Sequence, residues 1–330
     1  MERIMMAHGS GGRVSHELIQ ALFQKHLGNM YLDQMNDATV LPGNDNIAVT
    51  TDSFVISPLF FRGGNIGKLA VCGTVNDLAV SGAIPQFLTL ALILEEGLPI
   101  RDLEEIIESV AQTADQAGVK VVCGDTKVVE RGNADKIFIN TTGIGYITNR
   151  LVGPKYIQPG DEILITGTIG DHGIAILSER EGLEFQTPVL SDCAPLNRLI
   201  DDFYLPGVKC MRDPTRGGVA TTLNELAQQA GVSMILEEEK LPLLPSVQGA
   251  CGMLGLEPLY LANEGKALVI AAAEVAEEVL SKMKEHPLGR FAAKIGRVED
   301  GKPGLVLLDT PLGGKRIVGM LEGEHLPRIC

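Results

Sequence analysis

The chain has 330 residues, and its 42 acidic and 28 basic side chains give a net charge of −14 at neutral pH. A field of this sign repels polyanions, which argues against nucleic acid or an anionic membrane surface as the main partner. The length favours two domains, because a single hydrophobic core stops growing near this size. With 38 glycines, 4% aromatic residues and no tryptophan, the cores must be filled by aliphatic side chains.

The sequence carries no signal for export and no common transition-metal motif. The start of the chain lacks the apolar core of a signal peptide, and no stretch reaches the roughly 18 apolar residues of a membrane span. The six histidines form no H-E-x-x-H pattern and the six cysteines form no C-x-x-C pair. We therefore expect a cytoplasmic protein whose thiols are reduced. The cysteines are Cys72, Cys123, Cys193, Cys210, Cys251 and Cys330.

Hydrophobic periodicity predicts alternating strands and helices in the first half of the chain. Residues 102–118 give the clearest helix, with Asp102 as its expected N-cap and Gly118 as its expected end. The β-branched runs and the apolar runs of helical period complete a βαβαββ-like order. The expected helices are 15–27, 67–83 and 102–118, and the expected strands are 46–56, 86–94, 119–126 and 136–147.

A segment rich in Gly and Pro, 153–161, predicts a domain boundary near residue 150. The second half also mixes helices and strands, which indicates an α+β arrangement. From residue 313 onward no helix-length apolar face remains, so we expect a flexible tail. The expected division is an N-terminal domain 1–150, a C-terminal domain 151–312 and a tail 313–330. Helices are expected at 171–181, 216–230 and 274–285, and strands at 162–167, 232–236, 267–273, 291–298 and 304–309.

Four aspartates stand where strands end or helices turn, namely Asp45, Asp52, Asp77 and Asp125. Taken singly, each is most often a turn former or a helix cap. Taken together, they suggest carboxylates that converge on a cation, because converging carboxylates repel one another unless a cation neutralises them. Ligands that are all oxygen suit Mg²⁺ that bridges phosphates.

Backbone and lysine groups offer candidate phosphate contacts. The segment HGSGG, residues 8–12, precedes a predicted helix and either presents backbone N–H groups to an anion or forms an ordinary loop. Residues 63–70 resemble a P-loop only superficially, since Leu69 replaces the Ser or Thr that holds Mg²⁺. Lys127 is a candidate to meet a phosphate or a carbonyl oxygen, with an ordinary surface lysine as the alternative.

The last residue, Cys330, differs in context from the other cysteines. An ordinary thiol is a few per cent thiolate at neutral pH, which suffices for acylation by a partner enzyme. Its tail is broken by Gly323 and Pro327, and about twelve extended residues span roughly 40 Å, enough to carry the thiol into a cleft. The alternative is a cysteine that ends the chain by accident.

Seven segments together carry a resemblance to a known family: HGSGG, TDSFVISP, VNDLAVSGA, CGDTKVV, DPTRGGVA, ANEGKA and the terminal PRIC. With this combination the chain resembles, from end to end, the HypE family of hydrogenase maturation carbamoyl dehydratases. The glycine-rich start and the aspartates are shared with a superfamily that includes aminoimidazole ribonucleotide synthetase, selenophosphate synthetase and thiamine-monophosphate kinase. The ending PRIC singles out the HypE family.

The resemblance implies a PurM-like α+β fold (α/β-type, two-domain), with an N-terminal α/β domain and a C-terminal α+β domain. Its N-terminal sheet would pair with that of a second subunit into a dimeric β-barrel, with ATP and Mg²⁺ in the cleft of this assembly. The resemblance further implies Mg²⁺ on Asp45, Asp52, Asp77 and Asp125. It implies that the nucleotide contacts these aspartates together with Gly9, Ser10, Gly11, Gly12, Asn76 and Thr126.

The resemblance also implies a reaction. The carbamoyltransferase HypF would load a carboxamide onto Cys330, and the chain would use ATP to dehydrate this carboxamide to a protein thiocyanate. The cyanide would pass to iron on a HypC–HypD scaffold complex and become a ligand of the [NiFe]-hydrogenase centre. In this reading Lys127 is the electrostatic partner of the phosphate or amide oxygen, and Glu264 is the base that removes the N–H protons.

Two other functions stay open at this level. The first is an ATP-dependent small-molecule kinase or synthetase of the same superfamily, although the segment HGSGG lacks the nearby cysteine that a selenophosphate synthetase needs. The second is a carrier protein without enzymatic activity, whose terminal thiol ferries a group. A carrier would need no phosphate chemistry, so the acidic and glycine clusters would then be coincidental.

Overall fold

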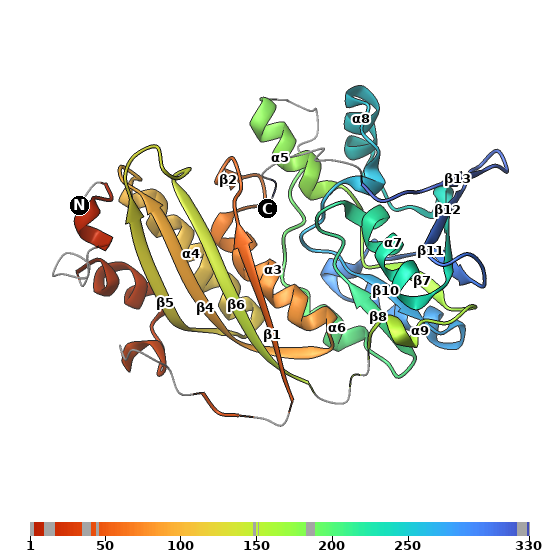
Figure 1. Cartoon of the computed structure of the whole chain (residues 1–330), viewed down its shortest axis with the longest axis horizontal. Helices are drawn as coiled ribbons and strands as arrows, with labels where there is room; N and C mark the ends of the chain where they lie inside the picture. The colour runs from red at the N-terminus through yellow and green to blue at the C-terminus, as the bar shows by residue number, and fades with distance from the viewer. Residues whose placement is uncertain are drawn as a thin grey trace.

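Two β-sheets organise the chain, one in each half, and helices lie between and around them (Figure 1). The computed structural model describes residues 3–9, 17–34, 41–43, 46–147, 150, 152–182, 189–321 and 329. Within these ranges, no helix combines the length and the apolar character needed to cross a membrane.

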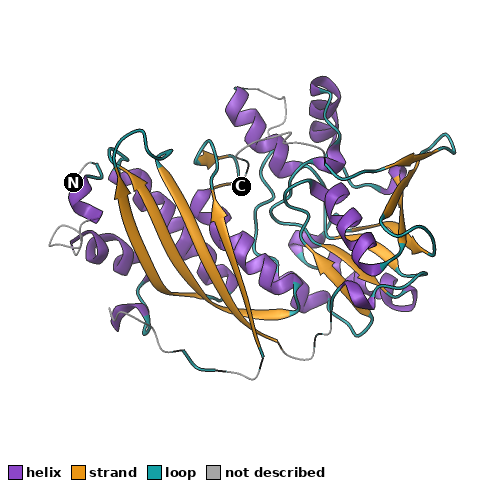
Figure 2. Ribbon diagram, viewed as in Figure 1, coloured by secondary structure: helices purple, strands orange, loops and turns teal. Residues whose placement is uncertain are grey.

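The first sheet has four strands in the order β1-β6-β4-β5. Strand β4 pairs in parallel with β5, while β6 runs antiparallel to both of its neighbours, so β1 and β5 form the two edges. In Figure 2 the four strands lie in front of α3 and α4, and their other face is turned to the viewer. The elements of this half are η1 (Met6–Gly9), η2 (Ile19–Gln24), α2 (Lys25–Leu27), η3 (Leu32–Gln34), β1 (Ile47–Phe54), β2 (Phe60–Phe61), β3 (Gly64–Asn65), α3 (Ile66–Val80), β4 (Ala83–Glu95), α4 (Ile100–Ala117), β5 (Lys120–Val129) and β6 (Ile137–Ile147).

The second sheet has seven strands in the order β13-β12-β9-β11-β7-β10-β8. Within this second sheet, as far as the structure describes it, only the β12–β9 pair is parallel. The elements of this half are η4 (Pro154–Tyr156), β7 (Glu162–Ile165), α5 (Asp171–Glu181), α6 (Asn197–Phe203), β8 (Val208–Arg212), α7 (Gly218–Ala230), β9 (Ser233–Glu237), η5 (Glu238–Lys240), α8 (Pro245–Leu254), η6 (Pro258–Tyr260), β10 (Leu268–Ala271), α9 (Ala273–Glu285), η7 (Pro287–Gly289), β11 (Ala293–Glu299), β12 (Leu305–Asp309) and β13 (Lys315–Ile317).

The hydrophobic cores of the two halves are continuous across the boundary. The cluster under the first sheet also contains Cys193, Ala262 and Ile329 from the second half, and the cluster around α6 and α9 contains Ala79 and Val80 from the end of α3. Since two clusters each contain residues of both halves, the halves share a continuous hydrophobic interior.

Most predicted elements are present within the described residues, and the differences concern one helix cap, the tail and a few elements that were not predicted. Helix α4 begins at Ile100 with Pro99 as its N-cap, so the prediction of Asp102 as the cap was wrong; this carboxylate lies in the first turn, where it also favours the helix. The helix does end at Gly118, whose φ of 75° permits the left-handed turn. Helices α6 and α8 and strand β8 were not predicted.

The predicted tail begins too early. Residues Lys315–Ile317 form β13 against β12, Val318 is buried, and its carbonyl accepts a hydrogen bond from the Nδ2 of Asn224 at 2.9 Å. This strand is a polar, exposed edge, so its sequence lacks the alternation that predicts strands. The positions of the expected boundary at 150 and of the tail beyond the described residues stay predictions.

Candidate active site

Helix α3 carries two of the predicted residues, Asn76 and Asp77, to the boundary between the halves. The helix begins at Asn65, whose side-chain Oδ1 accepts the N–H of Gly67 at 2.9 Å. A Cβ on Gly67 would lie 2.3 Å from the backbone oxygen of Ile106, so glycine is what allows α3 to lie directly against α4. Nearly every residue of α3 is buried, which fixes the orientation of its carboxyl-terminal half.

Asn76 links α3 to two loops of the second half. Its Nδ2 donates to the backbone oxygens of Ala194 at 3.1 Å and Glu264 at 3.2 Å, and its Oδ1 accepts the N–H of Leu196 at 2.8 Å. The side chain is only 1% exposed. Its hydrogen-bonding groups are engaged with these backbone atoms, which favours a structural role over the predicted nucleotide contact.

Asp52 and Asp77 lie together on the helix-covered face of the first sheet. Thr50 Oγ1 donates to Asp77 Oδ2 at 2.8 Å, which ties β1 to α3. Burial, followed by the charge of Asp77, raises the pKa of Asp52 to about 6, and the positive charge of Arg216 opposes this rise. The Asp52 carboxyl therefore holds its proton more tightly than usual, and a cation beside it would favour the ionised form.

Asp213 comes from the second half and completes this acidic group. It follows β8 and is 9% exposed. Burial and then the charge of Asp77 raise its pKa to about 7, with a smaller contribution from Asp52. Asp213 and Asp77 both line a pocket of about 510 Å³ between the halves, which Thr50, Ser81 and Arg212 also line.

Glu264 lies in the loop before β10, next to this acidic group. The carboxyl is 3% exposed, and its Oε1 has no hydrogen-bond partner among the described residues. Burial, then the neighbouring Cys193 and Asp213, raise its pKa well above the ordinary value. A buried and unpartnered carboxyl of this kind is unusual unless it serves a ligand or a proton transfer.

The acidic group offers the carboxylate oxygens that Mg²⁺ prefers as ligands. Within the described residues, the one trio whose ligand atoms all lie within 4.8 Å of one another is elsewhere, at His26, Glu104 and Glu108. At that trio, Glu104 already accepts a hydrogen bond from Lys25 Nζ at 2.7 Å. The aspartates at the boundary are less tightly gathered, and Mg²⁺ usually takes only one or two carboxylates beside water and substrate phosphates.

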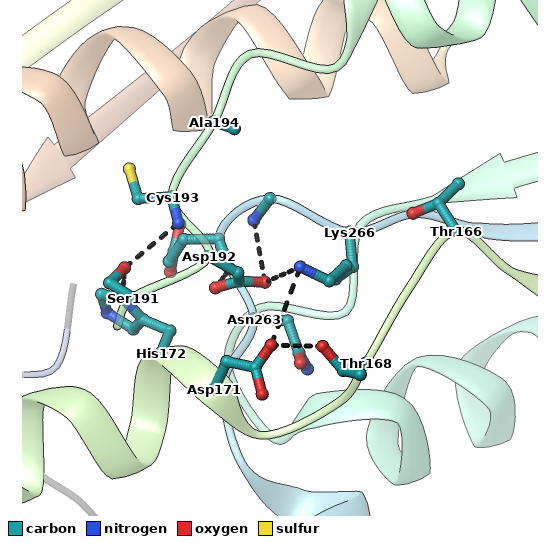
Figure 3. A network of polar contacts seen from close by, with 12 residues as sticks. Thr166, Thr168, Asp171, His172, Ser191, Asp192, Cys193, Ala194, Asn263 and Lys266 are labelled. Atoms are coloured by element: carbon teal, nitrogen blue, oxygen red, sulfur yellow. Dashed lines mark hydrogen bonds and ion pairs between the residues drawn. The ribbon is translucent and has the colours of Figure 1, made fainter. Parts of the chain in front are cut away.

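A second polar network joins Asp192, Lys266 and Asp171 (Figure 3). Asp192 Oδ1 accepts a hydrogen bond from the backbone N–H of Glu264 at 3.1 Å, and Asp192 Oδ2 accepts one from Lys266 Nζ at 3.1 Å. Burial opposes the charge of Asp192, but Lys266 and the other donors outweigh it, so the pKa of Asp192 lies below its ordinary value. Asp171 lies 4.0 Å from the same lysine and accepts Thr168 Oγ1 at 2.5 Å. The network fixes the backbone from which Glu264 projects.

The structure brings some of the predicted residues together but not Asp125 and Lys127. One row of paired residues crosses the sheet from Asp52 on β1, through Thr141 on β6 and Leu90 on β4, to Gly124 on β5. Asp52 and the neighbour of Asp125 are therefore three strand spacings of about 4.8 Å apart. Asp125 and Lys127 point to the open face, are each 67% exposed, and lie 3.9 Å apart. Thr126 alternates with them and faces the helices. Within a single chain, Asp125 and Lys127 therefore lie on a different edge and face of the sheet from Asp52.

Several predicted residues lie at or beyond the limits of the described structure. Gly9 ends the short 3₁₀ helix η1. Ser10, Gly11, Gly12, Asp45 and Cys330 lie outside the described residues. Ile329 is described, and its backbone oxygen accepts a hydrogen bond from His172 Nε2 at 2.8 Å.

Sequence reasoning missed Asp213, Asp192, Lys266 and His172. Asp213 stands at the start of the segment DPTRGG and Lys266 ends the segment ANEGK; both segments carry the family resemblance, but neither residue was singled out. Asp192 and His172 belong to no recognised motif. They meet through the packing of separate loops, for which the sequence gives no local signal.

Comparisons with known proteins agree with this architecture. The model of the AIR synthase related protein, N-terminal domain, matches residues 35–147, and the model of its C-terminal domain matches residues 158–307. Carbamoyl dehydratase HypE of Cupriavidus necator is 52% identical over 334 residues, which cover 99% of this chain and 95% of that protein. The Escherichia coli protein of the same name is 47% identical over the full length of both.

Solved structures give the same result. A crystal structure of hydrogenase maturation protein HypE in complex with ATP has a TM-score of 0.96 at 48% identity and covers 99% of both chains. A HypE–HypF complex has a TM-score of 0.82 at 51% identity, covering 92% of this chain and 99% of the other. A thiamine-monophosphate kinase of Stenotrophomonas maltophilia, 21% identical with a TM-score of 0.68, shares the fold alone. The chain belongs to the AIR synthase related family and, within it, to the HypE carbamoyl dehydratases, which are enzymes.

Proposed function

We propose that the protein uses ATP to dehydrate an S-carboxamide on its own Cys330 to a thiocyanate, which supplies the cyanide ligands of the [NiFe]-hydrogenase iron. The observation that carries the proposal is the burial of Ile329, whose carbonyl is bound by His172 beside the loop of Asp192. Asp192 in turn holds the backbone of Glu264. The end of the chain thus has a binding position close to a buried carboxyl.

The chemistry requires the carboxamide oxygen to become a better leaving group. The oxygen attacks the γ-phosphorus of ATP and ADP leaves, while the nitrogen loses one proton. The C–O bond then breaks, phosphate departs, and loss of the second N–H proton gives the nitrile. The products are thiocyanate, ADP, phosphate and one proton, and the oxygen of the lost water is in the phosphate.

Glu264 is the candidate base for these N–H protons. Its pKa is raised by burial and by neighbouring acids, which brings a carboxyl closer to the operating pH of a general base. Its Oε1 has no partner among the described residues, so it is available to a substrate N–H.

The acidic group at the pocket is the candidate site for nucleotide phosphates with Mg²⁺. Asp52, Asp77 and Asp213 would hold the ion, which when bound neutralises charge on the transferring phosphoryl group. Asp45 belongs to the same proposal from its sequence motif. The HypE relative that was crystallised with ATP supports the assignment of ATP as the phosphoryl donor.

We further propose that the working form is a homodimer whose two open sheet faces meet in a barrel. The open face exposes Ile47, Val49 and Ile93, by 53%, 64% and 43% respectively, which is unusual for side chains of this kind on one sheet. Asp125 and Lys127 share this face. A second copy placed against it would bring the partner's Lys127 toward a site that a single chain leaves without it.

HypF and a HypC–HypD complex are the proposed partners. The solved complex of a related HypE with HypF supports HypF as the carbamoyl donor. The HypC–HypD iron scaffold follows from the proposed product, since a thiocyanate has to deliver its cyanide to iron.

One experiment tests the proposed reaction. The full chain is incubated with HypF, carbamoyl donor and ATP, and the peptide 316–330, released by cleavage after Lys315, is weighed. We expect an adduct on Cys330 that loses the mass of one water only when ATP is present. An adduct that is indifferent to ATP would indicate a carrier, and absence of any adduct would indicate a small-molecule enzyme. The Cys330→Ser variant is the control and should carry no adduct.

A further inference from the structure

His172 and Ser191 lie apart from the acidic group, and neither was assigned a role by the sequence. His172 is fully buried in the first turn of α5, and Phe61 packs edge-on against its ring with centroids 5.6 Å apart. Ser191 is 8% exposed in the loop that precedes Asp192. A buried imidazole needs partners for both ring nitrogens, and both are present.

The hydrogen bonds of His172 fix its tautomer. The backbone oxygen of Ile329 can only accept, so the Nε2 that lies 2.8 Å from it carries the hydrogen. Nδ1 is then an acceptor, and the Ser191 hydroxyl 2.8 Å away donates to it. Ser191 Oγ in turn accepts the N–H of Cys193 at 3.1 Å. The chain of donors runs in one direction, from the Cys193 amide to the carbonyl of Ile329.

Burial keeps His172 in this neutral form. Burial is the main cause that lowers the pKa of His172 below its ordinary value, against the opposing charge of Asp192 and the bond to Ile329. The position of Ser191 is also fixed, because its N–H donates to the backbone oxygen of Arg62 at 2.8 Å. Gly63, with a φ of +100°, allows this approach, since a Cβ there would lie 2.8 Å from the Ser191 backbone oxygen.

Ile329 is held by packing as well as by this hydrogen bond. Its side chain is 7% exposed and belongs to the cluster that contains Phe61, Cys193 and Ala262. Ala262 is two residues before Glu264, and Cys193 is one of the groups that raise the pKa of Glu264. The peptide bond that follows the bound carbonyl is the one that joins Ile329 to Cys330.

We propose that the His172–Ser191 pair is the docking site for the carboxyl-terminal residues of the chain, and that His172 is a positioning residue that holds the penultimate carbonyl so that Cys330 is presented toward Glu264. The pair does not touch the reacting atoms. It sets the fraction of molecules in which the tail is docked. It thereby sets how often Cys330 is inside the protein and how often it is accessible to the partner that loads it. The second part of this inference rests on the proposed dehydration, but the docking itself does not.

A matched pair of variants tests the docking without ATP or carbamoyl donor. The terminal amide of glutamine reaches the position of the imidazole Nε2, whereas that of asparagine reaches only the position of Nδ1. His172→Gln should therefore keep the bond to Ile329, and His172→Asn should lose it. The measurement is the rate at which N-ethylmaleimide modifies Cys330 in the full chain, read from peptide 316–330, with thermal unfolding as the check on folding.

We expect slow modification in the wild type and in His172→Gln, and modification about fivefold to tenfold faster in His172→Asn, the change that loss of one neutral hydrogen bond produces. Equal rates for the two variants, or an asparagine variant within twofold of the wild type, would overturn the proposal. If neither variant folds, a second pair of variants in the tail tests the proposal. Ile329→Asp should make Cys330 react faster with N-ethylmaleimide, and Ile329→Val should not. Equal modification rates for these two variants would overturn the proposal.

The same variants separate this proposal from the proposed reaction. With carbamoylated protein and ATP, His172→Asn should lose water from the Cys330 adduct at least about tenfold more slowly than His172→Gln, while loading by HypF is not slowed. If the wild type shows no ATP-dependent water loss, the proposed reaction fails. The ranking of maleimide rates then still decides whether the tail docks on His172.

Discussion

Asn76 donates a hydrogen bond to the backbone oxygen of Glu264 at 3.2 Å, so a helix of the first half directly positions the candidate base in the second half. The same amide group bonds Ala194, and its oxygen accepts from Leu196. One buried side chain therefore satisfies three backbone groups of two different loops, which lie at the boundary that also contains the pocket.

Asn76→Ala should loosen this boundary. The change leaves two backbone oxygens and one N–H without partners in a buried environment, and each such group costs about 1–3 kcal/mol. We expect the free energy of unfolding to fall by about 2–4 kcal/mol in denaturant titrations. Asn133→Ala, at an exposed residue whose side chain donates to Glu130 at 3.2 Å, is the control and should change it by less than about 0.5 kcal/mol. A small effect of Asn76→Ala would contradict the linking role.

The acidic group predicts an unusual dependence of stability on pH. The pKa of Asp213 is about 7 in the folded chain and near its ordinary low value when unfolded. A raised pKa stabilises the fold at low pH, and this contribution is lost as the pH rises through about 7. Asp213→Asn should therefore raise the melting temperature of the ligand-free protein by at least about 2 °C near pH 8, and by much less near pH 5.

The stabilisation of the protein by magnesium should depend on pH in the same range. A cation competes with the protons on Asp52 and Asp213, so stabilisation by MgATP is expected to be larger near pH 8 than near pH 5. The Asp213→Asn variant should lose most of this difference. Equal Mg²⁺-dependent shifts in melting temperature at both pH values would show that these carboxyls do not meet the ion.

Much of the fold could be predicted from the sequence because its signals are local. The apolar period of α4 and the glycine at 118 define that helix, and strand β1 is a run rich in β-branched residues. The failures concern elements whose formation depends on distant partners. Strand β13 is exposed and polar, and it forms because β12 and Asn224 receive it.

The candidate site was predictable only where a motif marks it. Asp52 and Asp77 were found, and the structure brings them together through Thr50. Asp192 and His172 were missed because their partners come from separate segments, 19 to 157 residues away in the chain. Asp125 was expected beside the other aspartates, but strand order places it on the opposite edge and face, a fact that no local pattern encodes.

Removing only the cation of the Asp192–Lys266 ion pair should destabilise the protein more than removing both charges. The Asp192 side chain is 1% exposed and that of Lys266 is 10% exposed. Lys266→Met leaves two buried carboxyls, Asp192 and Asp171, without their cation, and should destabilise the protein by about 3–5 kcal/mol. The double variant Lys266→Met with Asp192→Asn should recover part of this loss. Additive losses in denaturant titrations would contradict a direct pairing.

Mixed dimers test whether Lys127 acts across the proposed subunit interface. Lys127 lies on the open sheet face, while Glu264 lies on the opposite side of the first sheet from that face, with α3 between. Lys127→Ala and Glu264→Gln should each prevent formation of thiocyanate on Cys330 when present in both subunits. In a dimer with one subunit of each kind, one site regains both groups if Lys127 comes from the partner. Because about half of randomly assembled dimers are mixed, about a quarter of the chains should then carry thiocyanate after coexpression. If coexpression restores nothing beyond the separate variants, Lys127 does not serve the site of the other subunit.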